Sequence, residues 1–227
     1  MCDDKYKRCK SFYNVVVKRC LDFIVAIFML ILLSPLFLIV ALAIIFNTGF
    51  PVFYKGERGG YKDKPFYMYK FRTMFHGQKN KGSVITKEND DRITKVGRFL
   101  RKHKIDEYPQ LINIIKGEMS FVGPRPETYY YINTFSEEDR KMLLVRPGIT
   151  DYASLEFNNQ EELIGDADPD EYYVKYILPR KNELRLKYLE ELSFGTDFKI
   201  FWATVSTVFG KCVKKSCEDK VPESIEE

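Results

Sequence analysis

The chain has 227 residues, of which 45% are hydrophobic, and a formal net charge of +4. This length can hold one domain, with or without additional segments. So small a net charge excludes a protein that coats nucleic acid, although a local cluster of bases would suit a membrane surface or a phosphorylated substrate. The five cysteines have no repeated metal-binding spacing, and their odd number is typical of a reducing compartment rather than a disulfide framework.

Residues 1–17 form a polar and basic segment, and an uncharged run then extends over the 24 residues from Phe23 to Phe46. At about 1.5 Å per residue, a helix of this length can cross a bilayer. The run is too long for the apolar part of a cleaved signal peptide, and no clean cleavage site follows it. We therefore expect it to be retained.

Two features argue against a simple membrane span. Pro35 lacks the N–H that would bond the carbonyl of Ile31, so the helix should kink at Ser34-Pro35, where the Ser34 hydroxyl can take a carbonyl that the proline frees. The flanks are also balanced, with six bases in residues 1–19 and six in residues 47–72, so the positive-inside rule assigns no orientation. On these residues alone, a re-entrant helix over 18–48 and a kinked single-pass helix are equally favoured.

Residues 51–75 predict a β-hairpin, because turn residues around Gly59-Gly60 and Pro65 separate alternating apolar and polar positions. Lys70 and Arg72 are spaced by two on the second strand and would share one face. Together they could contact a phosphate; the simpler alternative is a pair of solvated bases.

Asp106 and Glu107 lie between a cluster of bases and an apolar helical pattern that begins after Pro109. Before them, a loop over 76–90 and a helix from Asp91 with basic faces are expected. The pair can simply cap the following helix, which Gly117 would end. Alternatively, an Asp kept ionised at a helix start beside bases is a plausible nucleophile.

Two rigid turns carry an arginine each: Pro124-Arg125-Pro126 and Arg146-Pro147-Gly148. Flanking prolines fix the backbone, and arginine suits bidentate recognition of phosphate. Further helices are expected at about 137–144, 170–177 and 180–192, with an acidic loop over 156–171. Residues 193–210 have a broad aromatic face that fits an interfacial or a core helix equally. The tail, 211–227, is charged and expected to be disordered; it holds Cys212 and Cys217, whose role the sequence does not indicate.

Four motifs in this order resemble those of the bacterial sugar transferases, specifically the small PglC-like form of the monotopic polyprenyl-phosphate phosphoglycosyl transferases. The resemblance covers about residues 12–209. It implies an α+β, mostly helical fold with a re-entrant membrane helix over 18–48, a cytoplasmic catalytic domain with a short β-hairpin over 49–192, and an amphipathic interfacial helix over 193–210. The motifs are residues 70–74 (KFRTM), 106–113 (DEYPQLIN), 117–126 (GEMSFVGPRP) and 145–150 (VRPGIT).

The resemblance implies transfer of a sugar 1-phosphate from a UDP-sugar to undecaprenyl phosphate, with release of UMP and a requirement for Mg²⁺. This is the first membrane step of a bacterial glycan pathway, at the inner membrane with the catalytic domain facing the cytoplasm. Expected partners are both substrates and membrane lipids but no nucleic acid, and a homodimer is left open. The sugar and the pathway are not indicated.

The same resemblance assigns roles to site residues. Asp106 is the expected nucleophile and metal ligand, through an aspartyl-phosphosugar intermediate, and Glu107 is expected to manage a proton. The candidates for phosphate binding are Lys70, Arg72, Arg101, Arg125 and Arg146. The rival hypothesis is a non-enzymatic, membrane-anchored basic module that binds anionic lipid; it leaves Asp106-Glu107 and the Arg125 turn unexplained.

One stretch departs from the family's pattern. After Thr150, many members continue with Gly-Trp-Ala-Gln-Val-Asn-Gly-Arg, whereas this chain has Asp151 at the first position and Asn158 in place of the arginine. The departure leaves the substrate contacts at this end of the site undecided.

Overall fold

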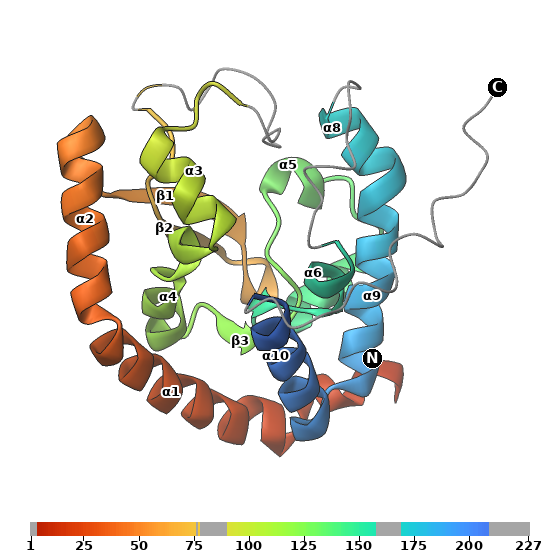
Figure 1. Ribbon diagram of the computed structural model, residues 1–227. Helices are drawn as coiled ribbons and strands as arrows, with labels where there is room; N and C mark the ends of the chain where they lie inside the picture. Colours follow the sequence, from red (N-terminus) through yellow and green to blue (C-terminus); the bar gives the residue numbers. More distant parts are fainter. Residues whose placement is uncertain (1–3, 76, 78–89, 158–168, 209–227) are drawn as a thin grey trace.

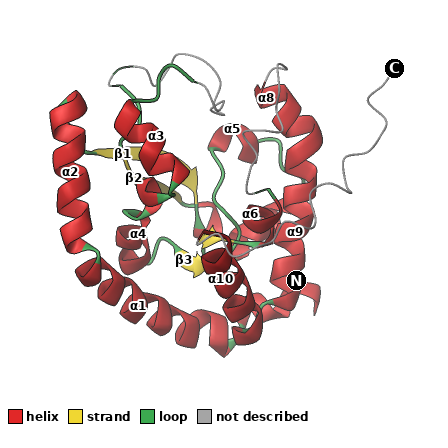
Figure 2. Cartoon of the chain, in the orientation of Figure 1, coloured by secondary structure: helices red, strands yellow, loops and turns green. Residues whose placement is uncertain are grey.

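The computed structural model of the protein describes residues 4–75, 77, 90–157 and 169–208. Most of the expected loop at 76–90, much of the expected acidic loop with Asn158, and the tail with Cys212 and Cys217 lie outside these residues. The described part consists mainly of helices with two small sheets (Figure 2), which confirms the predicted α+β, mostly helical class.

The apolar run forms two helices, α1 (Lys18–Leu32) and α2 (Ser34–Thr48), which meet at a bend of 60°. The Ser34 hydroxyl donates a hydrogen bond to the Ile31 carbonyl at 2.8 Å, so the predicted break at Ser34-Pro35 is confirmed. The two helices curve around one side of the molecule (Figure 1). Among the described helices, none alone is long and apolar enough to cross a membrane, whereas the bent pair from Tyr13 to Thr48 passes that test together.

Each of these two helices has a packed side and an exposed apolar side. Ala26 of α1 and Ile44 of α2 are buried against the rest of the molecule. In contrast, Phe28, Ile31 and Phe46 are 64%, 69% and 85% exposed. So much contiguous apolar surface is unusual for a monomer in water and marks an interaction surface.

The predicted hairpin is confirmed as strands β1 (Phe53–Gly59) and β2 (Pro65–Phe71), which pair antiparallel with Tyr54 opposite Lys70. The next helix, α3 (Lys95–Lys102), begins later than the predicted start at Asp91. The reason is that Ile93 pairs with Met74 in a β-bridge, after which the Thr94 side chain caps the helix by accepting from the Gly97 N–H.

Helix α4 (Gln110–Lys116) ends at Gly117, whose φ of 84° is the predicted left-handed cap. Next come β3 (Ser120–Val122), α5 (Tyr129–Ile132), a 3₁₀ helix (Asp139–Leu144), β4 (Gly148–Thr150) and α6 (Tyr152–Glu156). After the second gap, α8 (Pro169–Tyr172) continues through the turn Tyr173–Ile177 into α9 (Leu178–Glu191), and α10 (Phe194–Val208) follows.

Helix α10 has a buried side and an exposed aromatic side. Ile200 and Asp197 are buried, and the Asp197 carboxylate lies 2.8 Å from the Lys18 ammonium, which ties α10 to α1. Phe194, Phe198 and Trp202 lie on another side and are each nearly 60% exposed. The helix therefore contributes to the core and leaves an aromatic stripe on the surface.

Strands β3 and β4 pair in parallel, which the sequence analysis did not predict. They bring the two arginine-bearing turns together at Gly123 and Gly148, where the backbones are in direct contact. A Cβ atom added to Gly148 would lie 2.2 Å from the Gly123 nitrogen. Only residues without side chains permit this approach.

Gly148→Ala is expected to lower the free energy of unfolding, because the new Cβ would clash with the Gly123 backbone. Overpacking of this kind costs about 1–3 kcal/mol, which urea denaturation can measure. Gly195→Ala in α10 is the matched control, since its Cβ would meet nothing within 4 Å. Equal stability of the two variants would contradict the close packing of the turns.

Candidate functional site

The Glu107 carboxylate lies between two cations that come from distant parts of the chain. The Lys70 ammonium on β2 is 2.7 Å from Oε1 of Glu107, and the Arg125 guanidinium donates to the same oxygen. Burial disfavours the ionised form, but the charges of Arg125 and Lys70 outweigh it and hold the pKa of Glu107 well below its usual range. Glu107 is therefore ionised near neutral pH and links three segments.

The adjacent Asp106 has a different environment. It is 6% exposed, and its carboxylate has no hydrogen bond or ion pair with any residue that the structure describes. Burial raises the pKa of Asp106, with a further contribution from Glu107, although Lys70, Arg101 and Lys104 oppose the shift. Asp106 is thus a carboxylate that lies near cations but forms no ion pair with any described cation.

The local backbone separates the two carboxylates. They belong to a 3₁₀ turn (Ile105–Glu107) that follows Lys104 in a left-handed conformation with a φ of 56°. Since α4 starts only at Gln110, the pair precedes that helix rather than occupying its first turn. The expected position of Asp106 at the start of α4 is therefore replaced by a separate turn, where burial raises its pKa and the charges of Lys70, Arg101 and Lys104 oppose that shift.

Helix α4 fixes Lys70 relative to this turn through Asn113, which is completely buried. The Asn113 side chain accepts a hydrogen bond from the Tyr69 N–H at 3.0 Å and donates to the Tyr67 carbonyl at 2.8 Å. An amide that satisfies both backbone groups holds the strand edge in one register. Lys70, the residue after Tyr69, is thereby presented to Glu107.

Arg125 is held at both its backbone and its side chain. Its backbone N–H donates to the Asp151 carboxylate at 2.9 Å, and Nη1 donates to the Ile149 carbonyl at 2.6 Å. Pro124 and Pro126 restrict the chain on either side, as the sequence predicts. With the guanidinium held in this way, Nη2 donates to Glu107.

The other predicted phosphate ligands divide into two groups. Arg101 bonds the Thr73 hydroxyl at 3.0 Å and is near enough to Asp106 to influence its charge. Arg72 instead donates to Thr48 and to the Gly49 and Phe50 carbonyls, at the end of α2. Arg146 donates to the Gly117 carbonyl at 2.9 Å, where it caps α4. The structure therefore gathers Lys70, Arg101 and Arg125 at Asp106-Glu107, but not Arg72 or Arg146.

Arg58 is a cation near this site that the sequence analysis assigned only to a turn. Strand β1 extends to Gly59, so Arg58 lies on the same hairpin face as Tyr54 and its partner Lys70. The one hydrogen bond of its side chain among the described residues is donated to the Glu57 carbonyl at 2.8 Å. Burial lowers the pKa of Arg58, to which nearby Arg125 contributes. The spacing of two along the strand was the signal that could have found it.

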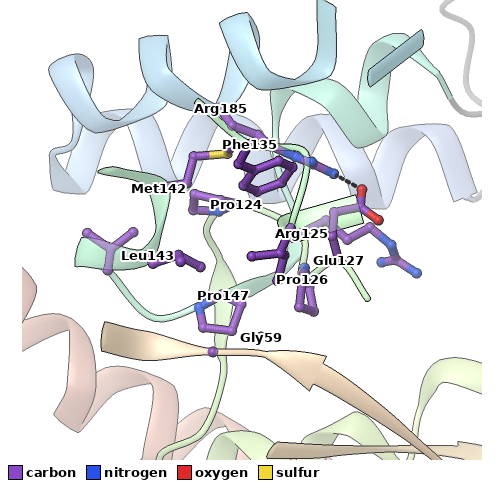
Figure 3. Close-up of a pocket in the computed structure, with 13 residues that line it drawn as sticks. Gly59, Pro124, Arg125, Pro126, Glu127, Phe135, Met142, Leu143, Pro147 and Arg185 are labelled. Atoms are coloured by element: carbon purple, nitrogen blue, oxygen red, sulfur yellow. Dashed lines mark hydrogen bonds and ion pairs between the residues drawn. The ribbon is translucent and has the colours of Figure 1, made fainter. Parts of the chain in front are cut away.

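Arg125 also borders a cleft that lies away from the two carboxylates. The cleft encloses about 310 Å³ of empty space, part of it open to solvent, and it includes neither Asp106 nor Glu107. Figure 3 shows Arg125, Glu127 and Arg185 on one side of this cleft. Its remaining walls are Gly59, Gly60, Pro124, Pro126, Ile132, Phe135, Met142, Leu143, Val145 and Pro147.

A metal ion at this site would have few protein ligands. Within the described ranges, no three or more His, Cys, Asp or Glu side chains are grouped so that they could hold a metal ion. Mg²⁺, however, is often held by one or two carboxylates together with substrate phosphates. Asp106, whose oxygens have no bonding partner among the described residues, fits that mode of binding.

Comparison with known proteins gives the family. A family model described as bacterial sugar transferase matches residues 13–211, nearly the whole chain. The chain belongs to the bacterial sugar transferase family. This result confirms the family that the sequence motifs indicated.

Several relatives in this family are similar along most of the chain. The sugar transferase EpsL of Bacillus subtilis is 37% identical, with 86% of this chain and 88% of EpsL covered. UDP-glucose:undecaprenyl-phosphate glucose-1-phosphate transferase of Escherichia coli is 35% identical over 85% of this chain, but only 40% of that protein is covered. For a UDP-N-acetylgalactosamine-undecaprenyl-phosphate N-acetylgalactosaminephosphotransferase of Aeromonas hydrophila, the identity is 32% and the coverages are 85% and 43%. The chain thus spans less than half of the length of these last two relatives.

Glu107→Gln is expected to lower stability near neutral pH, because it leaves Lys70 and Arg125 without their carboxylate. The loss should be about 1–3 kcal/mol, the range for hydrogen bonds to charged groups. Because folding lowers the pKa of Glu107, its stabilising effect is complete above the unfolded pKa of about 4.3 and is lost as pH falls toward the folded value.

Urea denaturation of both proteins between pH 7 and pH 3 measures this difference. The expected result is a gap in stability that is constant above about pH 5 and narrows below it. Glu183→Gln, at an exposed ion pair with Arg180, is the control and should change stability by less than about 0.5 kcal/mol. A gap that widens at low pH would contradict the assigned ion pairs.

Proposed function

We propose that this protein transfers a sugar 1-phosphate from a UDP-sugar to undecaprenyl phosphate and releases UMP. The observation that carries the proposal is the buried Asp106 carboxylate, which has no described partner and lies beside Lys70 and Arg101. The relatives from Escherichia coli and Aeromonas hydrophila are named for the same type of reaction. A nucleophile flanked by cations is what transfer between two phosphate-bearing substrates requires.

The reaction takes place in two displacements at one phosphorus atom. An Asp106 oxygen attacks the sugar-linked phosphorus of the UDP-sugar, a P–O bond to Asp106 forms, and UMP leaves with the bridging oxygen and its electron pair. An oxygen of undecaprenyl phosphate then attacks the same phosphorus. The bond to Asp106 breaks, the carboxylate is regenerated, and the product is a polyprenyl diphosphate sugar.

Four cations are the proposed ligands for the phosphate oxygens. Lys70, Arg101 and Arg125 are the predicted residues that the fold gathers, and Arg58 is the addition from β1. Lys70 and Arg125 each have further donors besides those directed at Glu107. Held in place before substrate arrives, these donors stabilise charge on the transferring phosphoryl group without reorganising.

For Glu107 we propose that its main role is to hold Lys70 and Arg125. A carboxylate whose pKa is strongly lowered is a weak base, which disfavours the predicted proton-handling role. The acceptor also has little need for such help, because the second pKa of a phosphate monoester is about 6, so much of it is dianionic at neutral pH.

Mg²⁺ is part of the proposal. Asp106 and the substrate diphosphate would hold the ion, which when bound neutralises charge on the departing UMP.

The acceptor's lipid chain requires a membrane, and we propose that α1 and α2 form a re-entrant hairpin in the bacterial inner membrane. The bend at Ser34-Pro35 and the exposed apolar side of both helices support this assignment. The exposed aromatic stripe of α10 would lie in the interface, with the catalytic domain on the cytoplasmic side. The site would then lie at the level of the lipid headgroups.

The function is tested with purified protein, undecaprenyl phosphate, Mg²⁺ and a panel of UDP-sugars. Continuous release of UMP is expected from at least one UDP-sugar, and it should stop when the polyprenyl phosphate is omitted or EDTA is added. A basic module that only binds anionic lipid would release no UMP from any UDP-sugar, and this result would overturn the proposal.

The nucleophile is tested by intact mass spectrometry after incubation with the active UDP-sugar but no acceptor. The wild-type protein should gain the mass of one sugar phosphate, and Asp106→Asn should gain none, because an amide is not nucleophilic. Asp91→Asn, at an exposed position, should form the adduct normally. An adduct on the Asp106→Asn protein would show that another residue attacks.

A further inference from the structure

Two buried charged side chains, Arg185 and Asp151, lie behind Arg125 together with the partly buried Glu127. Arg185 of α9 is 2% exposed, and Asp151, which precedes α6, is completely buried. The Arg185 guanidinium lies 2.8 Å from Oε1 of Glu127 and 3.4 Å from Oδ2 of Asp151. Figure 3 shows the ion pair of Arg185 with Glu127 beside Arg125. We call these three residues the Arg185 cluster.

The cluster holds the backbone at Arg125 and at Glu127, two residues later. The Asp151 oxygen that faces Arg185 also accepts the Arg125 backbone N–H at 2.9 Å. Glu127 follows Arg125 by two positions, and its carboxylate accepts from the Tyr173 hydroxyl at 2.6 Å. The backbone carbonyl of Glu127 accepts from the Gly59 N–H at 3.1 Å. The Arg125 segment is therefore anchored to α9, to the turn before α9 and to the hairpin.

The cluster is also arranged so that Asp151 cannot easily move. Its second oxygen, Oδ1, accepts hydrogen bonds from both the N–H and the hydroxyl of Ser154, each at 2.6 Å. Burial would favour the neutral form of the Asp151 and Glu127 carboxyls, but Arg185 holds the pKa of each below its ordinary value. Both carboxylates thus stay charged, and each depends on Arg185 for its main counterion.

We propose that Arg185 is a positioning residue for the transfer reaction: through Asp151 and Glu127 it fixes the backbone from which Arg125 reaches Glu107. The role in catalysis rests on the proposed function, whereas the anchoring of the Arg125 backbone does not. Arg185 itself contacts neither Asp106 nor Glu107 in the structure, so its effect on the reaction is indirect.

The first test measures the anchoring without any substrate. Hydrogen exchange of the peptide that contains the Arg125 amide is compared in wild type, Arg185→Gln and Arg185→Lys. Exchange should be at least tenfold faster in Arg185→Gln, because Asp151 loses its counterion, and Arg185→Lys should lie closer to wild type because it keeps the charge. Lys187→Gln, at an exposed ion pair with Glu191 on the same helix, is the matched control and should exchange as wild type.

Unchanged exchange at Arg125 in folded Arg185→Gln would overturn the proposal. If Arg185→Gln does not fold, Asp151→Asn replaces it, because it keeps the size and one acceptor oxygen but removes the charge that faces Arg185. Exchange in that variant should again be at least tenfold faster, and wild-type protection there would equally overturn the proposal.

The second test uses UMP release and a double-mutant cycle. Arg185→Gln should lower kcat at least tenfold in the wild-type background and by less than twofold when Arg125 is already Ala, since the two changes remove the same contribution. A merely structural role would lower the rate by the same factor in both backgrounds, which would overturn the positioning role. A wild-type protein that releases no UMP would refute the proposed function, while the exchange measurement would still decide the anchoring.

Discussion

The shared ion pairs of Glu107 with Lys70 and Arg125 organise the site. A strand of the hairpin, the turn before α4 and a proline-rich segment each supply one charge, and these segments are far apart in the sequence. A buried charge without its partner costs several kcal/mol, so none of the three segments can take another position cheaply. Asn113 and Asp151 reinforce the arrangement by bonding the backbones next to Lys70 and at Arg125. The geometry around Asp106 is a consequence of these constraints.

The two arginine-bearing turns show how similar sequences take on different tasks. Both turns lie at the parallel pair β3 and β4, and they touch at Gly123 and Gly148. From this common point Arg125 extends to Glu107, whereas Arg146 turns back to the carbonyl that ends α4. Arg125 therefore contributes to the site, whereas Arg146 stabilises α4, the helix that follows the turn of Asp106. The close packing of the glycines makes both possible.

The sequence predicts the features that local chemistry decides. The break at Ser34-Pro35, the hairpin and the end of α4 at Gly117 follow from a missing N–H, alternating residues and a left-handed cap. The pairing of β3 with β4 was not predictable, because three-residue strands separated by helices leave no periodic signal. The four motifs identify the family from sequence alone, and residues 13–211 confirm it.

The partners of the individual arginines could not be predicted from the sequence, because they depend on tertiary contacts. Arg72 on the predicted hairpin strand, and Arg125 and Arg146 in the two turns, look equally able to bind phosphate from the sequence. All three bond a backbone carbonyl after folding, but only Arg125 has a guanidinium nitrogen that also reaches Glu107. Arg185 had no signal at all, since one base within a helical pattern is most simply a solvated residue. Its counterions come from segments that only the tertiary structure brings beside α9.

Asp106 differs from the other carboxylates near Arg125 in its contacts with cations. Glu107, Glu127 and Asp151 each have a cation in contact, and in each case that cation lowers the pKa. Asp106 has no cation in contact within the part of the chain that the structure describes, and burial raises its pKa. The nearby Lys70 opposes this shift but pairs with Glu107. A fold selected for stability alone would not leave one buried carboxylate uncompensated beside cations that are committed elsewhere. The cost is understandable if an anionic substrate and its metal ion complete the charge balance, because the cations and the unbonded oxygens of Asp106 are then in place before the phosphate arrives.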